Sequence, residues 1–210
     1  MRIIPAILEK NLEEVKNNLD LIKDLASLVQ IDIMDGQFVA GKSVDLADLK
    51  ALEIKTPLEI HLMVNNPEDY FETCQSLGVR RVFWHYSAVK DRETEVFNKA
   101  GFFSFQKGLA INPEVELDSL NGSLEKYDAA LVMGVRPGSQ GQAFLPETAS
   151  RVKLLKSNFP KLTLGVDGGV SQLNIVDLKA AGAEDFMIGS ALFKTTNLKE
   201  EFNILTKLIS

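Results

Sequence analysis

Eight short apolar segments recur along the chain, and each is followed by a stretch with the spacing of an amphipathic helix. The apolar segments are residues 3–8, 28–33, 58–63, 81–85, 108–111, 129–135, 162–166 and 186–188. The helical stretches are residues 12–25, 46–52, 70–77, 96–100, 115–124, 149–159, 173–181 and 198–208. Near-continuous apolar strands that alternate with helices at intervals of about 25 residues are typical of a parallel barrel rather than an open sheet. The pattern therefore predicts an α/β fold, a single (β/α)8 TIM barrel over residues 1–210.

Composition narrows the classes of function. The chain has 23 basic and 29 acidic residues, a net charge of -6 and no cluster of Lys or Arg, so we expect neither a nucleic-acid nor a membrane partner. No run approaches the ~18 apolar residues of a membrane helix, and no signal peptide is expected. The only cysteine, Cys74, lies in a helical pattern and is expected in the core, which favours a reducing, cytoplasmic location.

Charged and polar residues end several of the predicted strands, at the rim where (β/α)8 barrels carry their reacting groups. Asp32 and His61 lie within the second and third apolar segments, and Asp167 directly follows the seventh. Because side chains alternate along a strand, Asp32 and His61 are expected inside the barrel, where a charge needs a partner. His85, which ends the fourth segment, is equally consistent with a core histidine, and Asp35 followed by glycine is more typical of a turn.

Glycine-rich turns beside Asp167 predict an anion site. Gly168 and Gly169 follow one strand and Gly189 follows the next, and such glycines let backbone N–H groups approach an anion closely. Ser190 is expected to begin a helix, whose dipole also favours negative charge. Ordinary strand-to-helix turns are the alternative interpretation.

The loop after the sixth segment lies on a neighbouring strand and contains Gly138, Ser139, Gln140 and Gly141. It is interpreted as a lid that offers backbone amides to an anion, or as a merely flexible loop. Three methionines, Met34, Met63 and Met133, also fall at strand ends on this rim, although methionine is usually plain core filler. Their common position favours contact with a substrate.

Asp32 and Asp167 come from strands that are three positions apart around the ring, so they are predicted to face each other across the barrel mouth. Two opposed carboxylates suit the removal of a proton from one face of a sugar and its return to the other, which inverts a carbon next to a carbonyl. Together with His61 they offer three ligands to a divalent metal, which would stabilise an enediolate.

The chain resembles the ribulose-phosphate 3-epimerase family in several segments that occur in the same order. These segments are residues 4–8, 31–39, 61–64, 65–67, 133–144, 166–170 and 189–193. The resemblance implies that Asp32 and Asp167 are the acid/base catalysts and metal ligands, that His61 is a further ligand, and that a ketose phosphate such as ribulose 5-phosphate is the substrate. The predicted substrate-binding residues are His61, Met34, Met63, Met133, Gly138, Ser139, Gln140, Gly141, Gly168, Gly169, Gly189 and Ser190.

The chain departs from the family pattern at several positions. The family has a metal-binding histidine where this chain has Gln30, and serine and histidine where it has Ala6 and Gln37; Pro-Asn is replaced by Ala40-Gly41. An amide oxygen is a poorer ligand for zinc-like ions than imidazole. We therefore expect an intact phosphate site and a divalent metal, Zn, Mn or Fe, that is bound weakly or not at all.

Two other classes of function remain open. The first is a sugar-phosphate-binding barrel without catalysis, which Gln30, Ala6 and Gln37 favour. The second is another phosphate-binding barrel enzyme, of tryptophan or thiamine synthesis or an orotidine-phosphate decarboxylase; the last is disfavoured because the third strand lacks an Asp-x-Lys-x-x-Asp pattern. The partners expected are a phosphorylated sugar and further copies of the chain in a homo-oligomer.

Overall fold

Eight parallel strands form a closed barrel in the computed structural model, which describes residues 1–120, 122–139 and 141–210. The strands are β1 (Arg2–Ile7), β2 (Val29–Met34), β3 (Leu58–Met63), β4 (Arg81–His85), β5 (Gln106–Ile111), β6 (Ala129–Met133), β7 (Thr163–Asp167) and β8 (Asp185–Ile188). Each strand pairs with the next in sequence, and β8 pairs with β1. The predicted (β/α)8 barrel is confirmed, and every predicted strand lies within two residues of an observed one at both ends.

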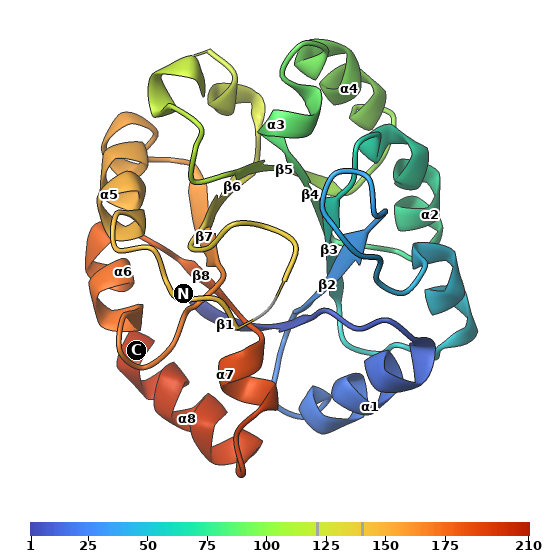
Figure 1. The fold of residues 1–210 in the computed structure, drawn as a ribbon, viewed down its shortest axis with the longest axis vertical. Helices are drawn as coiled ribbons and strands as arrows, with labels where there is room; N and C mark the ends of the chain where they lie inside the picture. The colour runs from blue at the N-terminus through green and yellow to red at the C-terminus, as the bar shows by residue number, and fades with distance from the viewer. Residues whose placement is uncertain (121, 140) are drawn as a thin grey trace.

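A ring of helices surrounds the strands, and both termini lie on the same side of the ring (Figure 1). The α-helices are α1 (Leu12–Ile22), α2 (Phe71–Ser76), α3 (Tyr86–Val89), α4 (Glu93–Ala100), α5 (Thr148–Asn158), α6 (Ile175–Ala181), α7 (Ser190–Phe193) and α8 (Leu198–Ile209). The 3-10 helices are η1 (Leu46–Ala51), η2 (Pro67–Tyr70), η3 (Leu117–Leu120) and η4 (Leu124–Lys126). Within the described residues, no helix is both long enough and apolar enough to cross a membrane.

Two of the stretches predicted as helices form only 3-10 turns. Residues 46–52 contain η1, and the described part of residues 115–124 contains η3 and the start of η4. Leu46, Leu49 and Leu52 recur at intervals of three, which suits the three residues per turn of a 3-10 helix better than a longer α-helix. Three leucines at intervals of three are compatible with a short α-helix as well as with a 3-10 helix, so the sequence could not distinguish the two.

Most of the hydrophobic core lies between the strands and the surrounding helices. Cys74 belongs to it and is fully buried in α2, as predicted. Local sequence signals set the helix limits: Asn11 accepts a hydrogen bond from the Glu14 amide at the start of α1 (2.9 Å), and Gly182 ends α6 at a φ of 110°. These limits orient the helices so that their apolar sides cover the barrel.

The barrel interior is layered. At the amino ends of the strands, Arg81 donates to Glu59 (2.6 Å) and Asp185 (2.8 Å), and Arg2 donates to Asp185 (2.7 Å). A second, smaller apolar cluster of barrel residues consists of Ile4, Ala6, Leu28, Phe83, Ala110, Ala129, Leu131, Met133 and Met187. Because side chains alternate along each strand, the residues beyond this cluster point into the carboxyl end of the barrel, where the polar residues gather.

Candidate active site

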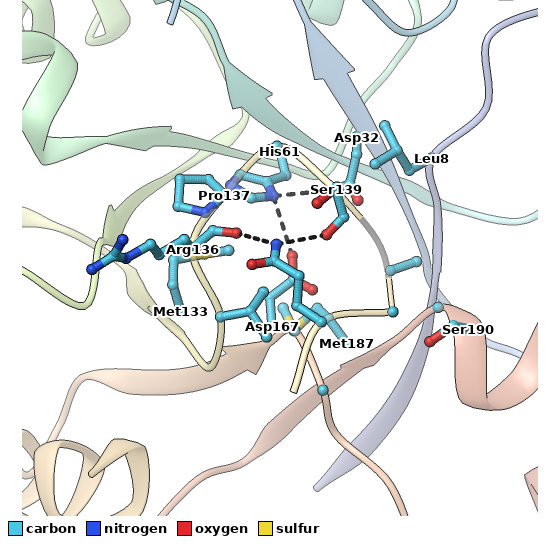
Figure 2. A pocket seen from close by; sticks show the side chains of 18 of the residues that line it. Leu8, Asp32, His61, Met133, Arg136, Pro137, Ser139, Asp167, Met187 and Ser190 are labelled. Carbon is cyan, nitrogen blue, oxygen red and sulfur yellow. Dashed lines mark hydrogen bonds and ion pairs between the residues drawn. The ribbon is translucent and has the colours of Figure 1, made fainter. Parts of the chain in front are cut away.

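Strand register places the three predicted acid, base and ligand residues at one level of the barrel. Asp32 of β2 is paired with His61 of β3, and Asp167 of β7 is paired with Met133 of β6 and Met187 of β8. All three polar residues are at most 8 % exposed. Figure 2 shows Asp32, His61 and Asp167 converging at one side of the cavity. Alternation predicted the inward position of Asp32 and His61, and strand order predicted that Asp167 faces Asp32.

Four polar groups close a ring of contacts at the base of this cavity. His61 Nδ1 lies 3.2 Å from Asp32 Oδ1 and 3.2 Å from Asp167 Oδ2. Opposite His61, the amide nitrogen of Gln30 donates to the same two carboxylate oxygens, at 2.8 Å each. The two carboxylates are therefore held close together by two donors rather than merely facing each other across the mouth.

The close approach of these groups changes their pKa values. Burial and the negative charge of Asp167 raise the pKa of Asp32 above its ordinary value. Burial alone would lower the pKa of His61, but hydrogen bonds to Asp167 and Asp32 outweigh it and raise this pKa to about 9. Burial and the positive charge of His61 hold the pKa of His85 well below its usual range. Near neutral pH the positive charge therefore resides on His61, between the aspartates.

Asp32, His61 and Asp167 fit a divalent metal. Each offers one ligand atom, and these atoms lie within 4.8 Å of one another. Two carboxylates and an imidazole form a donor set that zinc and similar ions accept, with further positions open to a substrate. Gln30 directs its N–H₂ group, which cannot act as a ligand, toward the carboxylates, and its buried Oε1 has no hydrogen-bond partner among the described residues. Asp32, His61 and Asp167 can therefore act as metal ligands as they stand. Gln30 could act as a fourth ligand only if its amide rotated to turn the oxygen toward the site.

Closely packed glycines form the adjoining part of the cavity. Gly168 and Gly169 adopt positive φ values of 97° and 69°, and a Cβ on Gly168 would lie 2.4 Å from the side chain of Val135. A Cβ on Gly134 would lie 2.3 Å from the carbonyl oxygen of Gly168. Ser190 begins α7, as predicted, directly after Gly189. Close packing therefore requires glycine at Gly134 and Gly168, and Gly168, Gly169 and Gly189 bring the backbone of two neighbouring loops to the cavity wall.

The segment after β6 extends over the barrel mouth (Figure 1). Gln142 holds its turn by donating to the carbonyl oxygens of Arg136 (2.6 Å) and Ser139 (2.9 Å), as the dashed lines in Figure 2 indicate. The Arg136 guanidinium points away from the cavity in this view. Gly138, Ser139 and Gly141 are the small residues that the described part of this segment contributes to the cavity lining.

Most of the residues predicted to bind substrate do line this cavity. Its described lining consists of Ala6, Leu8, Asp32, His61, Met63, Met133, Val135, Arg136, Pro137, Gly138, Ser139, Gly141, Gln142, Asp167, Gly168, Gly169, Val170, Met187, Gly189 and Ser190. Met34 is not in this set; it is buried at the end of β2, where its Cε lies 3.8 Å from a Cβ built on Gly41. Gln140 lies outside the described residues.

Two residues with alternative interpretations can now be assigned. The Asp35 carboxylate accepts hydrogen bonds from the amides of Gln37 (2.7 Å), Phe38 (2.9 Å) and Asn65 (2.9 Å), so it is a turn residue. His85 is a fully buried histidine with both ring nitrogens satisfied, yet one of its partners is His61. His85 is therefore a core histidine, as one interpretation held, but it also contacts a residue of the candidate site.

Sequence reasoning missed the role of Gln30 as a donor and the contribution of Leu8, Val135, Gln142 and Met187 to the cavity. A signal existed for Met187, which lies two residues before Gly189 on a strand that ends at the same rim. For Gln30, the alternation that placed Asp32 inside the barrel also placed the amide there, but it could not orient the amide.

The sequence matches the ribulose-phosphate 3 epimerase family over residues 2–193. It is 33% identical over 207 residues to a ribulose-phosphate 3-epimerase of Buchnera aphidicola, covering 94% of this chain and 90% of the relative. It is 31% identical over 206 residues to that of Schizosaccharomyces pombe, covering 95% and 90%. Among solved structures, phosphoribosyl anthranilate isomerase from Thermus thermophilus shares the fold, with a TM-score of 0.70 at 17% identity over 99% of this chain and 100% of that one. A match over nearly the full length, together with the paired aspartates, histidine and glycine loops of the cavity, shows that the chain belongs to the ribulose-phosphate 3-epimerase family of enzymes.

Proposed function

We propose that this chain inverts the configuration at C3 of a ketose phosphate, with ribulose 5-phosphate as the expected substrate. The observation that carries the proposal is the convergence of Asp32 and Asp167 beside a cavity lined by glycine backbone. Family relatives that are named ribulose-phosphate 3-epimerase support the choice of substrate. The glycine turns supply donors for a phosphate, and the carboxylates supply the acid and the base.

The reaction needs one ionised and one protonated carboxyl group. The ionised group removes the proton from C3, and the C–H electrons move into a C2–C3 double bond while the C2 carbonyl oxygen becomes negative. The protonated group then returns a proton to C3 from the opposite face, and the carbonyl re-forms. The raised pKa of Asp32 supports its role as the group that carries the proton at the start, with Asp167 as the base. Reaction in the reverse direction exchanges these roles.

His61 and Gln30 support this exchange of protons. The His61 ring contacts both carboxylates at 3.2 Å, and its positive charge stabilises whichever of them is ionised. The Gln30 amide donates to both at 2.8 Å and keeps their oxygens toward the same point. Asp32, His61 and Asp167 would hold a divalent cation, which when bound supplies positive charge for the oxygens of the substrate.

Deuterium uptake at C3 of ribulose 5-phosphate in heavy water tests the proposal, because proton removal from C3 leaves a solvent deuteron in the product. The protein is assayed as purified and after addition of Mn²⁺ or Zn²⁺. We expect uptake by the wild type and by Asp24→Asn, a matched change at an exposed aspartate outside the cavity. Asp167→Asn is expected to abolish uptake.

Absence of deuterium uptake with every metal, combined with retained binding of ribulose 5-phosphate, would contradict the proposal. It would support the alternative of a sugar-phosphate-binding barrel. The Gln30 amide is the feature that favours this alternative, because it places a donor where the family has a histidine ligand. Binding is measured from the shift in thermal unfolding on addition of the sugar phosphate.

A further inference from the structure

A chain of hydrogen bonds runs from His61 away from the aspartates. His61 Nε2 lies 2.8 Å from His85 Nε2, and His85 Nδ1 is hydrogen-bonded to Oδ1 of Asn112. The amide nitrogen of Asn112 in turn donates to Oε1 of Glu114 at 2.8 Å. His61 and His85 are fully buried and Asn112 is 4 % exposed, whereas Glu114 reaches the exposed surface. This series of hydrogen bonds therefore runs from β3 across β4 to the residues that follow β5.

The carboxylate of Glu114, at the outer end of this series, determines which atom donates and which accepts in each hydrogen bond. An ionised carboxylate only accepts hydrogen bonds, so Asn112 must turn its N–H₂ group toward Glu114 and its oxygen toward His85. That oxygen accepts, and His85 must then carry a hydrogen on Nδ1. In a neutral imidazole that is protonated on Nδ1, Nε2 carries no hydrogen and has a lone pair that can accept. His85 Nε2 is thus an acceptor, and the hydrogen between the two rings belongs to Nε2 of His61.

Electrostatics favour the same arrangement. A second hydrogen on the His85 ring would put a positive charge beside His61 and Asn112, with no carboxylate in contact among the described residues. The same charge on His61 contacts two carboxylates at 3.2 Å. The ring of Phe38, 4.8 Å from that of His85 between centroids, would attract a charged His85 only through a cation–π contact, which is weaker than the contact of His61 with two carboxylates.

We propose that His85 and Asn112 are positioning residues that fix the orientation of His61 and keep a hydrogen on its Nε2. Because His85 accepts the hydrogen on His61 Nε2, only Nδ1 of the His61 ring faces Asp32 and Asp167. A histidine that binds a metal commonly has its other nitrogen held in this way, and the partner sets which nitrogen faces the site. The bonding pattern itself is independent of the proposed function; only its effect on turnover rests on that function.

The first test is nuclear magnetic resonance of the protein labelled with ¹⁵N-histidine and treated with a chelator. The chain has 2 histidines, so every ring signal belongs to His61 or His85. We expect a scalar coupling across the hydrogen bond between the two Nε2 atoms, with the hydrogen bonded to His61 and with His85 protonated on Nδ1. Absence of the coupling, or a hydrogen bonded to Nε2 of His85, would overturn the proposal.

Variants then separate positioning from simple packing. Asn112→Leu removes the acceptor that sets the His85 tautomer, so the coupling is expected to disappear, whereas the matched change Asn203→Leu on the exposed face of α8 should preserve it. His85→Leu leaves His61 without a partner, and His85→Gln restores an acceptor near the same position. Retention of the coupling in folded Asn112→Leu would contradict the proposed role of Asn112.

Zinc affinity, measured by competition with a chelator, provides the second readout. Loss of a partner that orients a ligand typically weakens metal binding about 10- to 100-fold, and this loss is expected for His85→Leu and Asn112→Leu. His85→Gln and Asn203→Leu should bind zinc nearly as the wild type does. Unchanged zinc affinity in His85→Leu would overturn the positioning role. Failure of the wild type to exchange deuterium at C3 would instead count against the proposed function and leave the coupling result intact.

Discussion

Replacement of Gln30 by histidine should convert a weak metal site into a strong one. In the wild type, the Gln30 amide nitrogen donates to Asp32 Oδ1 and Asp167 Oδ2 at 2.8 Å each, so a hydrogen-bond donor occupies the side of the site opposite His61. A cation that enters must compete with this donor for both carboxylate oxygens. In Gln30→His, an imidazole can offer a lone pair there instead, and the site gains a fourth ligand.

The size of the effect follows from these two bonds. Hydrogen bonds to charged groups contribute about 1.5–3 kcal/mol each, and the wild type forfeits part of that energy when a cation displaces the amide. We expect a net gain in affinity for Zn²⁺ or Mn²⁺ of about 10- to 100-fold in Gln30→His, which corresponds to about 1.4–2.8 kcal/mol. The same variant without metal should unfold more easily, because an imidazole has one N–H on that side where the amide provided two donors.

The assay combines metal analysis after dialysis against EDTA, competition with a chromophoric chelator, and thermal unfolding with and without metal. Gln30→Leu is the matched control, because it removes both hydrogen bonds and adds no ligand; it should be destabilised without gaining affinity. Deuterium uptake at C3 is followed in parallel and is expected to rise in Gln30→His with the metal bound. A full equivalent of metal that survives dialysis in the wild type would refute the reasoning, and so would equal affinity in Gln30→His and Gln30→Leu.

Three further predictions address other parts of the molecule. Asp32→Asn and Asp167→Asn should each slow C3 proton exchange at least ~10²-fold while urea unfolding still reports a folded protein, and near-normal exchange in either would contradict the two-carboxylate mechanism. Arg81→Leu leaves the buried Glu59 carboxyl group without its partner, while Asp185 keeps Arg2, and should lower the free energy of unfolding by about 3–5 kcal/mol, measured with urea against an exposed control, Arg80→Leu. Burial raises the pKa of the Cys74 thiol to about 12, so only roughly one thiol in 10⁴ is ionised at pH 8; mass spectrometry should show that iodoacetamide modifies it only after unfolding, and rapid modification of the native protein would refute this.

The fold could be predicted because its signal is repetitive. Eight buried strands give eight apolar segments, and an error of one or two residues at an end, as for β2 and β6, does not change the order of strands or the face on which they end. The same alternation placed Asp32 and His61 inside the barrel, and strand order brought Asp167 near them. These predictions depend on backbone periodicity, which a sequence records directly.

The details of the site depend on side-chain orientation, which a sequence does not record. The sequence could place Gln30 beside the site but could not orient its amide, whose nitrogen faces the carboxylates because two acceptors lie there. The partners of His85 come from β3 and from the residues after β5, 24 and 27 positions away in sequence. Met34 was expected to contact a substrate because it ends a strand at the rim; it does end β2, but the described cavity lining does not include it. None of these contacts could be assigned without the distances between side chains.

The distribution of charge within the barrel explains why only one end suits proton transfer. At the amino ends, Arg2 and Arg81 balance Glu59 and Asp185.

At the carboxyl ends, Asp32 and Asp167 face a single cation, His61, so the group carries one excess negative charge whenever both aspartates are ionised. Buried excess charge is costly, and it is relieved by a proton on one carboxyl group or by a bound cation. The raised pKa of Asp32 is the first of these responses. One protonated and one ionised carboxyl group, acting on opposite faces of C3, are what the proposed mechanism requires, so the imbalance that costs stability also prepares the pair for proton transfer.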